Sequence, residues 1–82
     1  MTITRENIRE WLEDGAEEGA THVIVICDTF SYEEYPVFVS SSEKVSDKVN
    51  SYRSKDMQTV MEVYNLSMDW DEQLKRERCF EY

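Results

Sequence analysis

Three carboxylates, Asp28, Glu33 and Glu34, lie close together in the segment 28–35, where they suggest two kinds of chemistry. Carboxylate oxygens bind calcium or magnesium, but this spacing is not that of an EF-hand loop, and the central glycine of such a loop is missing. Paired carboxylates also act as general acid and base when a pocket separates their pKa values, and the sequence indicates no such pocket. We therefore expect neither a metal site nor catalytic residues in this segment.

The single histidine and the two cysteines are the other candidates for ligands or nucleophiles. His22 and Cys27 are an odd number of residues apart, so in a strand they would point to opposite faces, and we expect His22 to be a half-buried structural residue. Cys27 is expected to be a small buried hydrophobe, whereas Arg76 and Arg78 beside Cys79 favour its thiolate. Reduced thiols are typical of a cytoplasmic protein, and a disulfide between the two is the less favoured alternative.

Serine and glycine patterns point away from catalysis as well. No Gly-x-Ser-x-Gly motif surrounds any serine, and the sequence contains no glycine-rich loop for phosphate. We therefore predict that the chain is not an enzyme and uses no cofactor.

An acidic stripe is the clearest feature that could contact a partner. In the segment 4–19 apolar residues recur at helical spacing, and four glutamates line up about half a turn away: Glu6, Glu10, Glu13 and Glu17. At the rise of an α-helix these carboxylates step by about 5 to 6 Å, which is within reach of the spacing of phosphates along a nucleic-acid strand. A protein partner with a basic surface is expected, and mimicry of nucleic acid is an alternative.

Aromatic residues alternate with the acids of the segment 28–35. Exposed Phe30 and Tyr32, flanked by Glu33 and Glu34, would suit recognition of a partner, because rings supply contact area at low entropic cost. The alternative is that Phe30, Tyr32 and Tyr35 fold back as a lid on the core.

Net charge supports the same class of partner. The chain of 82 residues carries −9, and residues 1–39 account for −7 of it. Such a field repels nucleic acid and anionic membranes and attracts basic partners, although it could serve only to keep a small protein soluble. The longest apolar run, Val23–Cys27, is far too short to span a bilayer, and no signal-like segment is seen, so we expect one domain, 1–82, in the cytoplasm.

Three helices are expected to position these residues. Thr4 is the expected N-cap of the first helix, and Gly19 is the expected left-handed residue after it. Gly15 on the apolar face of this helix indicates close approach to a strand.

Ser40 with Glu43 forms a capping-box pattern for a second helix over 41–53. A last helix is expected to start after Ser67 or after Asp69, which has Glu72 at its third position.

Three strands complete the prediction, over 21–27, 36–40 and 57–66. Pro36 cannot donate to a ladder, so the second strand should begin there and lie at an edge. The apolar first strand belongs in the middle, which gives a two-layer α+β domain with topology α-β-β-α-β-α and an antiparallel three-stranded sheet in the order 2-1-3. The third strand has apolar residues on both faces, which suits helices that cover parts of both. The strand order 1-2-3 is the alternative.

The segments Thr21–Val39 and Val60–Leu74 resemble those of a family of small phage and bacterial proteins of uncharacterised function. The resemblance covers most of the chain and carries over no functional residue. It implies a phage or prophage accessory protein that acts in a bacterial cytoplasm.

These observations together predict a small acidic, non-enzymatic module that binds a host or phage protein through the acidic helix and the aromatic loop. It is not expected to bind nucleic acid or a membrane directly. One alternative is a module for a small ligand or nucleotide, either as a monomer or as a homodimer. The other is a nucleic-acid mimic that inhibits a DNA-binding or RNA-binding protein.

Overall fold

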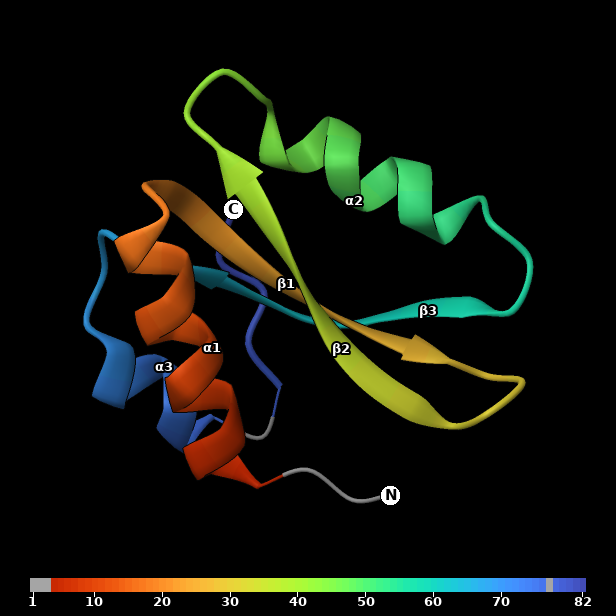
Figure 1. The fold of residues 1–82 in the computed structure, drawn as a ribbon, viewed down its shortest axis with the longest axis horizontal. Helices are drawn as coiled ribbons and strands as arrows, with labels where there is room; N and C mark the ends of the chain where they lie inside the picture. The colour runs from red at the N-terminus through yellow and green to blue at the C-terminus, as the bar shows by residue number, and fades with distance from the viewer. Residues whose placement is uncertain (1–3, 77) are drawn as a thin grey trace.

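Helices and strands follow the order α-β-β-α-β-α in the computed structural model, which describes residues 4–76 and 78–82 (Figure 1). The elements are α1 (Arg5–Glu17), β1 (Ala20–Asp28), β2 (Glu33–Ser40), α2 (Val45–Arg53), β3 (Gln58–Asn65) and α3 (Trp70–Lys75). The predicted class and element order are confirmed.

The sheet has β1 at its centre, paired antiparallel with β2 on one side and with β3 on the other. The predicted order 2-1-3 is therefore confirmed. The central position suits β1 because its middle residues, Val23 to Ile26, are all fully buried. Opposite these residues β3 has a bulge: Val25 pairs with Glu62 and Ile26 with Val60, so that one residue of β3 has no partner in β1.

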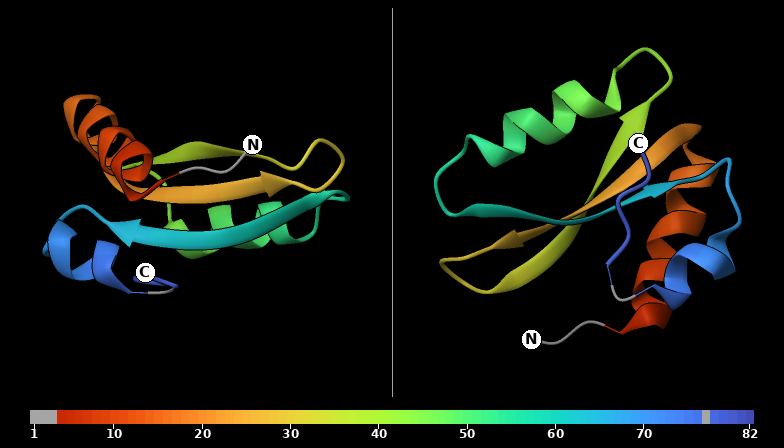
Figure 2. Two further views of the ribbon diagram at one scale, coloured as in Figure 1. Left: turned by 90° about the horizontal axis from the view of Figure 1, so that it is seen from below. Right: turned by 180° about the vertical axis from the view of Figure 1, so that it is seen from behind.

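Helices pack on both faces of the sheet, so the domain has three layers where two were expected. Val23 and Val25 point to the face covered by α1 and α3, and Ile24 and Ile26 point to the face covered by α2. Figure 2 shows α1 and α2 on opposite sides of the strands. The alternation in β1 explains the third layer, because a strand that is apolar on both sides needs a cover on each.

The first helix begins and ends where local signals place it. Thr4 caps its N-terminus: the Thr4 hydroxyl accepts a hydrogen bond from the Asn7 amide, and the Asn7 side chain accepts one from the Thr4 amide. Gly19, with φ of 78°, turns the chain into β1, as predicted. Ile8, Leu12 and Gly15 form the buried side of α1.

Gly15 marks the close approach of α1 to the sheet, as the sequence predicted. A Cβ atom at this position would lie 2.9 Å from Cγ2 of Val23 and 3.4 Å from Cδ1 of Phe38. Val23 is fully buried and cannot move aside freely. The glycine therefore lets the helix sit closer to β1 than any other residue would allow.

We predict that Gly15→Ala destabilises the protein by about 1 kcal/mol, although alanine is the better helix former by about that amount, because overpacking costs about 1 to 3 kcal/mol. Urea unfolding followed by tryptophan fluorescence measures the change. The control is Ala16→Gly on the exposed side of α1, where only helix propensity acts. A more stable Gly15→Ala variant would contradict the close packing.

Three predicted boundaries were wrong. The loop after β1 is only Thr29 to Tyr32, because β2 starts at Glu33 and runs through Pro36. A proline is tolerated within β2 because this strand is an edge strand, as expected, and the missing N–H costs no ladder bond. The helix α2 begins at Val45 and not at 41: Glu43 does accept hydrogen bonds from the Ser40 amide and hydroxyl, but they close the turn that leaves β2.

The last helix and the chain that follows it cover the outer side of β3. Asp69 caps α3 by accepting a hydrogen bond from the Glu72 amide. Of the two predicted caps, Ser67 and Asp69, it is therefore Asp69 that starts the helix. Beyond α3 the Cys79 carbonyl accepts from the Val63 amide at 2.8 Å, and the Glu81 amide donates to the Val63 carbonyl at 3.0 Å. This short parallel contact occupies part of the β3 edge.

Candidate partner-binding face

The four glutamates of the acidic stripe are all exposed on α1: Glu6, Glu10, Glu13 and Glu17. Within residues 4–76 and 78–82, none of these carboxylates takes part in an ion pair or a side-chain hydrogen bond. They lie opposite the buried side of the helix, as the spacing predicts. Their charge is therefore directed to solvent.

The two arginines of α1 lie on the flank between this stripe and the buried side, and they reach toward the rest of the domain. Arg9 pairs with Asp71 of α3, and Arg5 contacts Glu62 of β3 at 3.1 Å. The side of α1 that faces α3 is thereby neutralised, whereas the outer side stays acidic.

Two further acids of α1 were not singled out from the sequence. Successive helix residues are about 100° apart, so Trp11, Asp14 and Glu18 lie on the flank opposite Arg9, which is the flank toward β2. Asp14 and Glu18 are exposed, and Trp11 is half-buried against the core. The sequence alone does not reveal this flank, because its position depends on the side of α1 on which the edge strand lies.

The tip of the hairpin between β1 and β2 presents aromatic rings to solvent. Phe30 and Tyr32 are 76% and 71% exposed, so these two do not form a lid. The turn is held by the Asp28 side chain, which accepts from the Phe30 amide at 2.9 Å, and by the Asp28 carbonyl, which accepts from the Tyr32 amide. Met57, 57% exposed, adjoins the tip because its carbonyl accepts from the Thr29 amide.

The other members of the predicted loop belong to β2. Glu33 and Glu34 pair with Asp28 and Cys27 of β1, and Glu34 borders a shallow hollow shared with Arg5 of α1.

Tyr35 does fold onto the core: it packs in the α2 cluster, and its hydroxyl donates to Gln58. The lid interpretation is thus right for Tyr35 alone.

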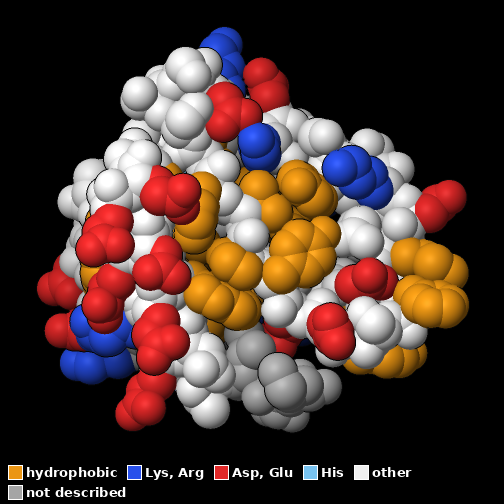
Figure 3. All heavy atoms as spheres, viewed as in Figure 1, with side chains coloured by type: hydrophobic (Ala, Val, Ile, Leu, Met, Phe, Trp, Pro, Cys, Tyr) orange, Lys and Arg blue, Asp and Glu red, His pale blue; other side chains and the backbone are white. Residues whose placement is uncertain are grey.

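An apolar strip along β2 joins the two predicted contact regions. Four consecutive residues of this edge strand are only half-buried: Tyr35, Pro36, Val37 and Phe38. Figure 3 shows apolar side chains gathered over β2, with acidic side chains of α1 to their left and of the hairpin side to their right. Acidic stripe, apolar strip and aromatic tip therefore share one face of the molecule, although α1 and the hairpin lie at opposite ends of it (Figure 1).

The cysteines do not have the setting of reactive thiols. Cys79 is fully buried, and burial raises the pKa of its thiol despite Arg76 nearby, so the predicted thiolate is wrong. The Arg76 guanidinium is instead engaged by Glu81. Cys27 is partly exposed rather than buried, and its pKa is also raised, by burial and by Glu34 and Asp28. Both cysteines are free thiols.

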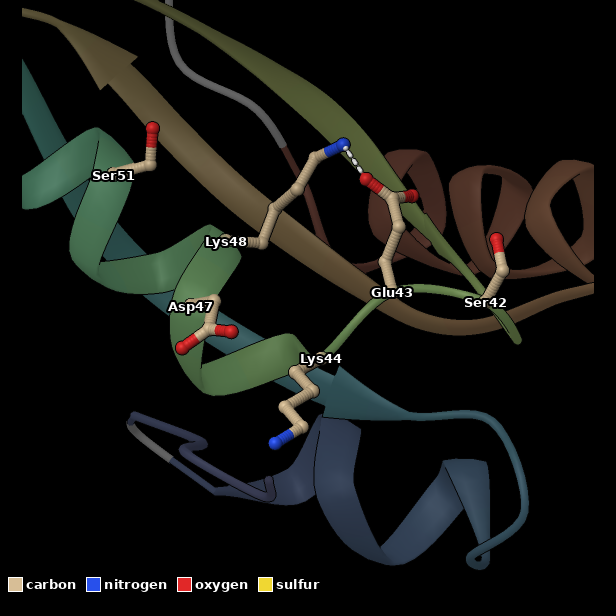
Figure 4. Close-up of a pocket in the computed structure, with 6 residues that line it drawn as sticks. All are labelled: Ser42, Glu43, Lys44, Asp47, Lys48 and Ser51. Carbon is tan, nitrogen blue, oxygen red and sulfur yellow. Dashed lines mark hydrogen bonds and ion pairs between the residues drawn. The ribbon is translucent and has the colours of Figure 1, made fainter.

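A surface hollow of about 500 Å³ lies at the start of α2 (Figure 4). Lys48 reaches across it to the Glu43 carboxylate at 2.6 Å. This contact, together with hydrogen bonds from Ser40, lowers the pKa of Glu43 to about 2. The charges of Glu43 and Lys48 therefore neutralise each other across the hollow, and Lys44 and Asp47 also line it. Among the residues that the structure describes, no three His, Cys, Asp or Glu side chains are grouped to hold a metal ion.

His22 lies at the start of β1, beside a hollow lined by Thr21, Asn65 and Leu66. Its Nδ1 forms a hydrogen bond of 2.8 Å with the Thr21 hydroxyl, which also lies 3.3 Å from the Val39 carbonyl. Its Nε2 is buried without a partner in the described part of the chain. Burial lowers the pKa of His22, so the ring is neutral in the folded protein at neutral pH.

We predict that acid destabilises the protein through His22. The unfolded state takes up the proton near the ordinary pKa of about 6.5, but the folded state takes it up only at lower pH, so stability is full above pH 6.5 and falls below it. Thermal melting at intervals from about pH 7 to about pH 5 should show this slope, and His22→Gln should reduce it. If the melting temperature of the variant fell with pH as steeply as that of the wild type, the loss of stability in acid would come from carboxylates and not from His22.

Comparison with protein-family models, with curated proteins and with solved structures found no significant match. Among the described residues, none of the helices has the length and apolar character needed to cross a bilayer.

Proposed function

We propose that this protein is a non-enzymatic binding module for a protein with a basic surface. The contact would use the acidic stripe of α1 and the aromatic tip with Phe30 and Tyr32, joined by the apolar strip of β2. The observation that carries the proposal is the acidic stripe itself: its carboxylates are exposed and make no ion pair within the described chain. Such charges accelerate association with a basic partner and favour it over acidic ones.

A binding role fits the chemistry of the candidate nucleophiles and bases better than a catalytic role. Both thiols have raised pKa values, which disfavours the reactive thiolate. The His22 ring is neutral, and the hydroxyl beside it, that of Thr21, is held by a hydrogen bond to the Val39 carbonyl within the sheet.

The proposed setting is a bacterial cytoplasm, with the protein acting as a phage or prophage accessory factor. Support for it comes from the resemblance noted for the segments 21–39 and 60–74 and from two free thiols, which a reducing compartment would preserve.

Mimicry of nucleic acid is a second candidate, favoured by one observation. The four stripe glutamates stand on a regular helix of 13 residues, so their carboxylates are evenly spaced on a rigid support. In that case the partner would be a protein whose basic groove normally holds DNA or RNA, and added nucleic acid would compete with the module.

The test is capture of partners from bacterial lysate at about 0.05 M and about 0.5 M salt, with immobilised wild-type protein and two charge variants. Glu13→Lys reverses a charge on the stripe. Asp47→Lys makes the same change on α2, on the other face of the sheet. We expect a partner that is lost at high salt and lost with Glu13→Lys but retained with Asp47→Lys. Equal capture by all three proteins would refute the proposal, and competition by DNA would favour mimicry.

A further inference from the structure

The outer edge of β2 is open in the part of the chain that the structure describes. β3 is partly covered by the segment with Cys79 and Glu81, and β1 is paired on both sides. An unpaired edge is a template for a further strand. Pro36 removes one donor from the middle of this edge, but the donors on either side of it remain.

The hydrogen bonds at one end of β2 fix which main-chain groups point outward. The Val39 carbonyl accepts from Thr21 of β1 and so faces inward, and the Ser40 amide is bonded outward to Glu43 at 3.1 Å. Main-chain groups alternate in direction along a strand, so those of Glu34, Pro36 and Phe38 face outward. This edge offers two N–H donors, from Glu34 and Phe38, and three carbonyl acceptors.

The side chains beside this edge differ between the two faces of the sheet. On one face α1 packs mainly on β1 and reaches β2 at two places: its first turn shares a shallow hollow with Glu34, and Gly15 approaches Phe38. The exposed acids Asp14 and Glu18 lie on the flank of α1 opposite Arg9 and add negative charge to this side of the sheet, where Glu34 is the acid within the strand itself. On the other face Tyr35 and Val37 are half-buried in the apolar α2 cluster. On the side of α1 an added strand would thus meet Glu34, followed by Pro36 and Phe38, and on the other side it would meet the apolar Tyr35 and Val37.

A second copy of this chain fits the edge poorly. Antiparallel pairing of two β2 strands about a twofold axis would place both α1 helices on the same face of the joined sheet. Each copy carries a net charge of −9, concentrated in its first half, so the acidic helices would repel. Pro36 would also leave one donor missing on each side of the joint.

We propose that an extended basic segment of the partner adds to the edge of β2 as a fourth strand. Its basic side chains would face α1 and Glu34, and its alternate apolar side chains would face Tyr35 and Val37. This inference rests on the proposed function, because it names how the basic partner of that same face is held.

The first test uses the wild-type protein and synthetic peptides of about eight residues in which lysine alternates with valine. One peptide is N-methylated at every lysine amide and another at every valine amide. All lysine amides point to one side of an extended strand and all valine amides to the other, so strand addition requires only one of the two sets. We expect one methylated peptide to bind like the parent and the other to lose binding at least tenfold. Equal affinity of both would overturn strand addition.

The second test changes the protein. Glu34→Pro removes an outward N–H and a charge, whereas Glu34→Gln removes only the charge. We expect Glu34→Pro to bind the peptide about fivefold more weakly than Glu34→Gln, as the loss of one backbone hydrogen bond predicts. Melting curves verify that both variants fold, and if Glu34→Pro does not, the methylated peptides decide.

Failure of this inference can be told apart from failure of the proposed function. If the peptides bind the wild type with equal affinity and amide shifts in NMR spectra map to α1 and the hairpin tip but not to Glu34 and Phe38, the edge is not used and the acidic face still is. If no basic peptide binds and no salt-sensitive partner is captured, both are wrong. A glutamate-valine peptide, which the acidic face should repel, is the charge control.

Discussion

Replacing Leu12 by alanine is expected to lower the free energy of unfolding by about 2 to 5 kcal/mol. Leu12 is fully buried and packs in the cluster that joins α1 to Val23 and Val25 of β1 and to Tyr64 of β3. The truncation removes apolar contact and leaves a cavity that the sheet cannot close. A domain of this size is stabilised by only about 5 to 15 kcal/mol, so the loss is a large share of the total.

Urea unfolding measures this loss through the fluorescence of Trp11 and Trp70, which both pack against the same cluster. Glu13→Ala is the matched control on the next residue, where the side chain is exposed and a change within about 0.5 kcal/mol is expected. If Leu12→Ala lowered the free energy of unfolding no more than Glu13→Ala, the packing of α1 against the sheet through Leu12 would be contradicted. The orientation of the acidic stripe would then be wrong too.

The parts of the fold that were predicted from sequence are those with local signals. The Thr4 cap, the apolar spacing of Ile8 and Leu12, and the left-handed Gly19 are all encoded within α1 and its borders. The strand order followed from one further fact, that β1 is apolar on both sides and therefore belongs in the centre.

The errors arose where tertiary position outweighs local preference. A proline often stands at the start of a strand, because it has no N–H to donate to the ladder. At the outer edge of a sheet that N–H would point to solvent, so β2 continues through Pro36 and begins at Glu33. Ser40 and Glu43 do form their predicted contact, yet Ser40 is paired with Ala20 in the ladder, and the chain needs a turn before α2 can begin.

Only part of the candidate face was predicted from the sequence, namely the acidic stripe and the aromatic tip. Exposure of the stripe glutamates follows from their position opposite Ile8 and Leu12, so periodicity alone was sufficient. The open edge of β2 depends on strand order, and the hollow that Glu34 shares with Arg5 depends on how α1 crosses the sheet. Neither is a property of any local segment.

Buried polar groups were missed for the same reason. Glu62 and Gln73 look like ordinary surface residues in the sequence, but both are buried. The Gln73 amide bonds to the main chain of Asn65 through both its oxygen, at 2.8 Å, and its nitrogen, at 2.9 Å, and so fastens α3 to the end of β3. Burial of such groups is tolerated only when partners are supplied, and those partners come from other elements.

The polar cluster around Glu62 gives the second large effect. The Glu62 carboxylate lies at the bulge of β3 and accepts hydrogen bonds from the Tyr64 hydroxyl at 2.7 Å, from Arg5 at 3.1 Å and from the Cys79 amide at 3.3 Å. It thereby ties α1 and the C-terminal segment to the sheet. Its three donors come from three separate parts of the chain, and the Tyr64 hydroxyl is the nearest of them.

Tyr64→Phe is expected to lower the free energy of unfolding by about 1 to 3 kcal/mol, because the buried carboxylate of Glu62 loses its nearest donor while the apolar ring stays in place. Urea unfolding at neutral pH measures the loss. Tyr82→Phe removes a hydroxyl from a ring that is 49% exposed and should leave stability unchanged. An equal effect of the two substitutions would mean that the Tyr64 hydroxyl is not needed in the Glu62 cluster.

The same variant should change the response to alkali. Burial, and then the hydrogen bond to Glu62, raise the pKa of Tyr64 well above that of a free phenol, so the folded state keeps the proton that the unfolded state loses near pH 10. Stability from this group is therefore full below about pH 10 and is lost as the pH rises above it. Melting temperatures between about pH 9 and about pH 11 should fall less steeply for Tyr64→Phe than for the wild type. Parallel curves would show that the hydroxyl of Tyr64 titrates alike in both states, and the buried hydrogen bond to Glu62 would then be absent.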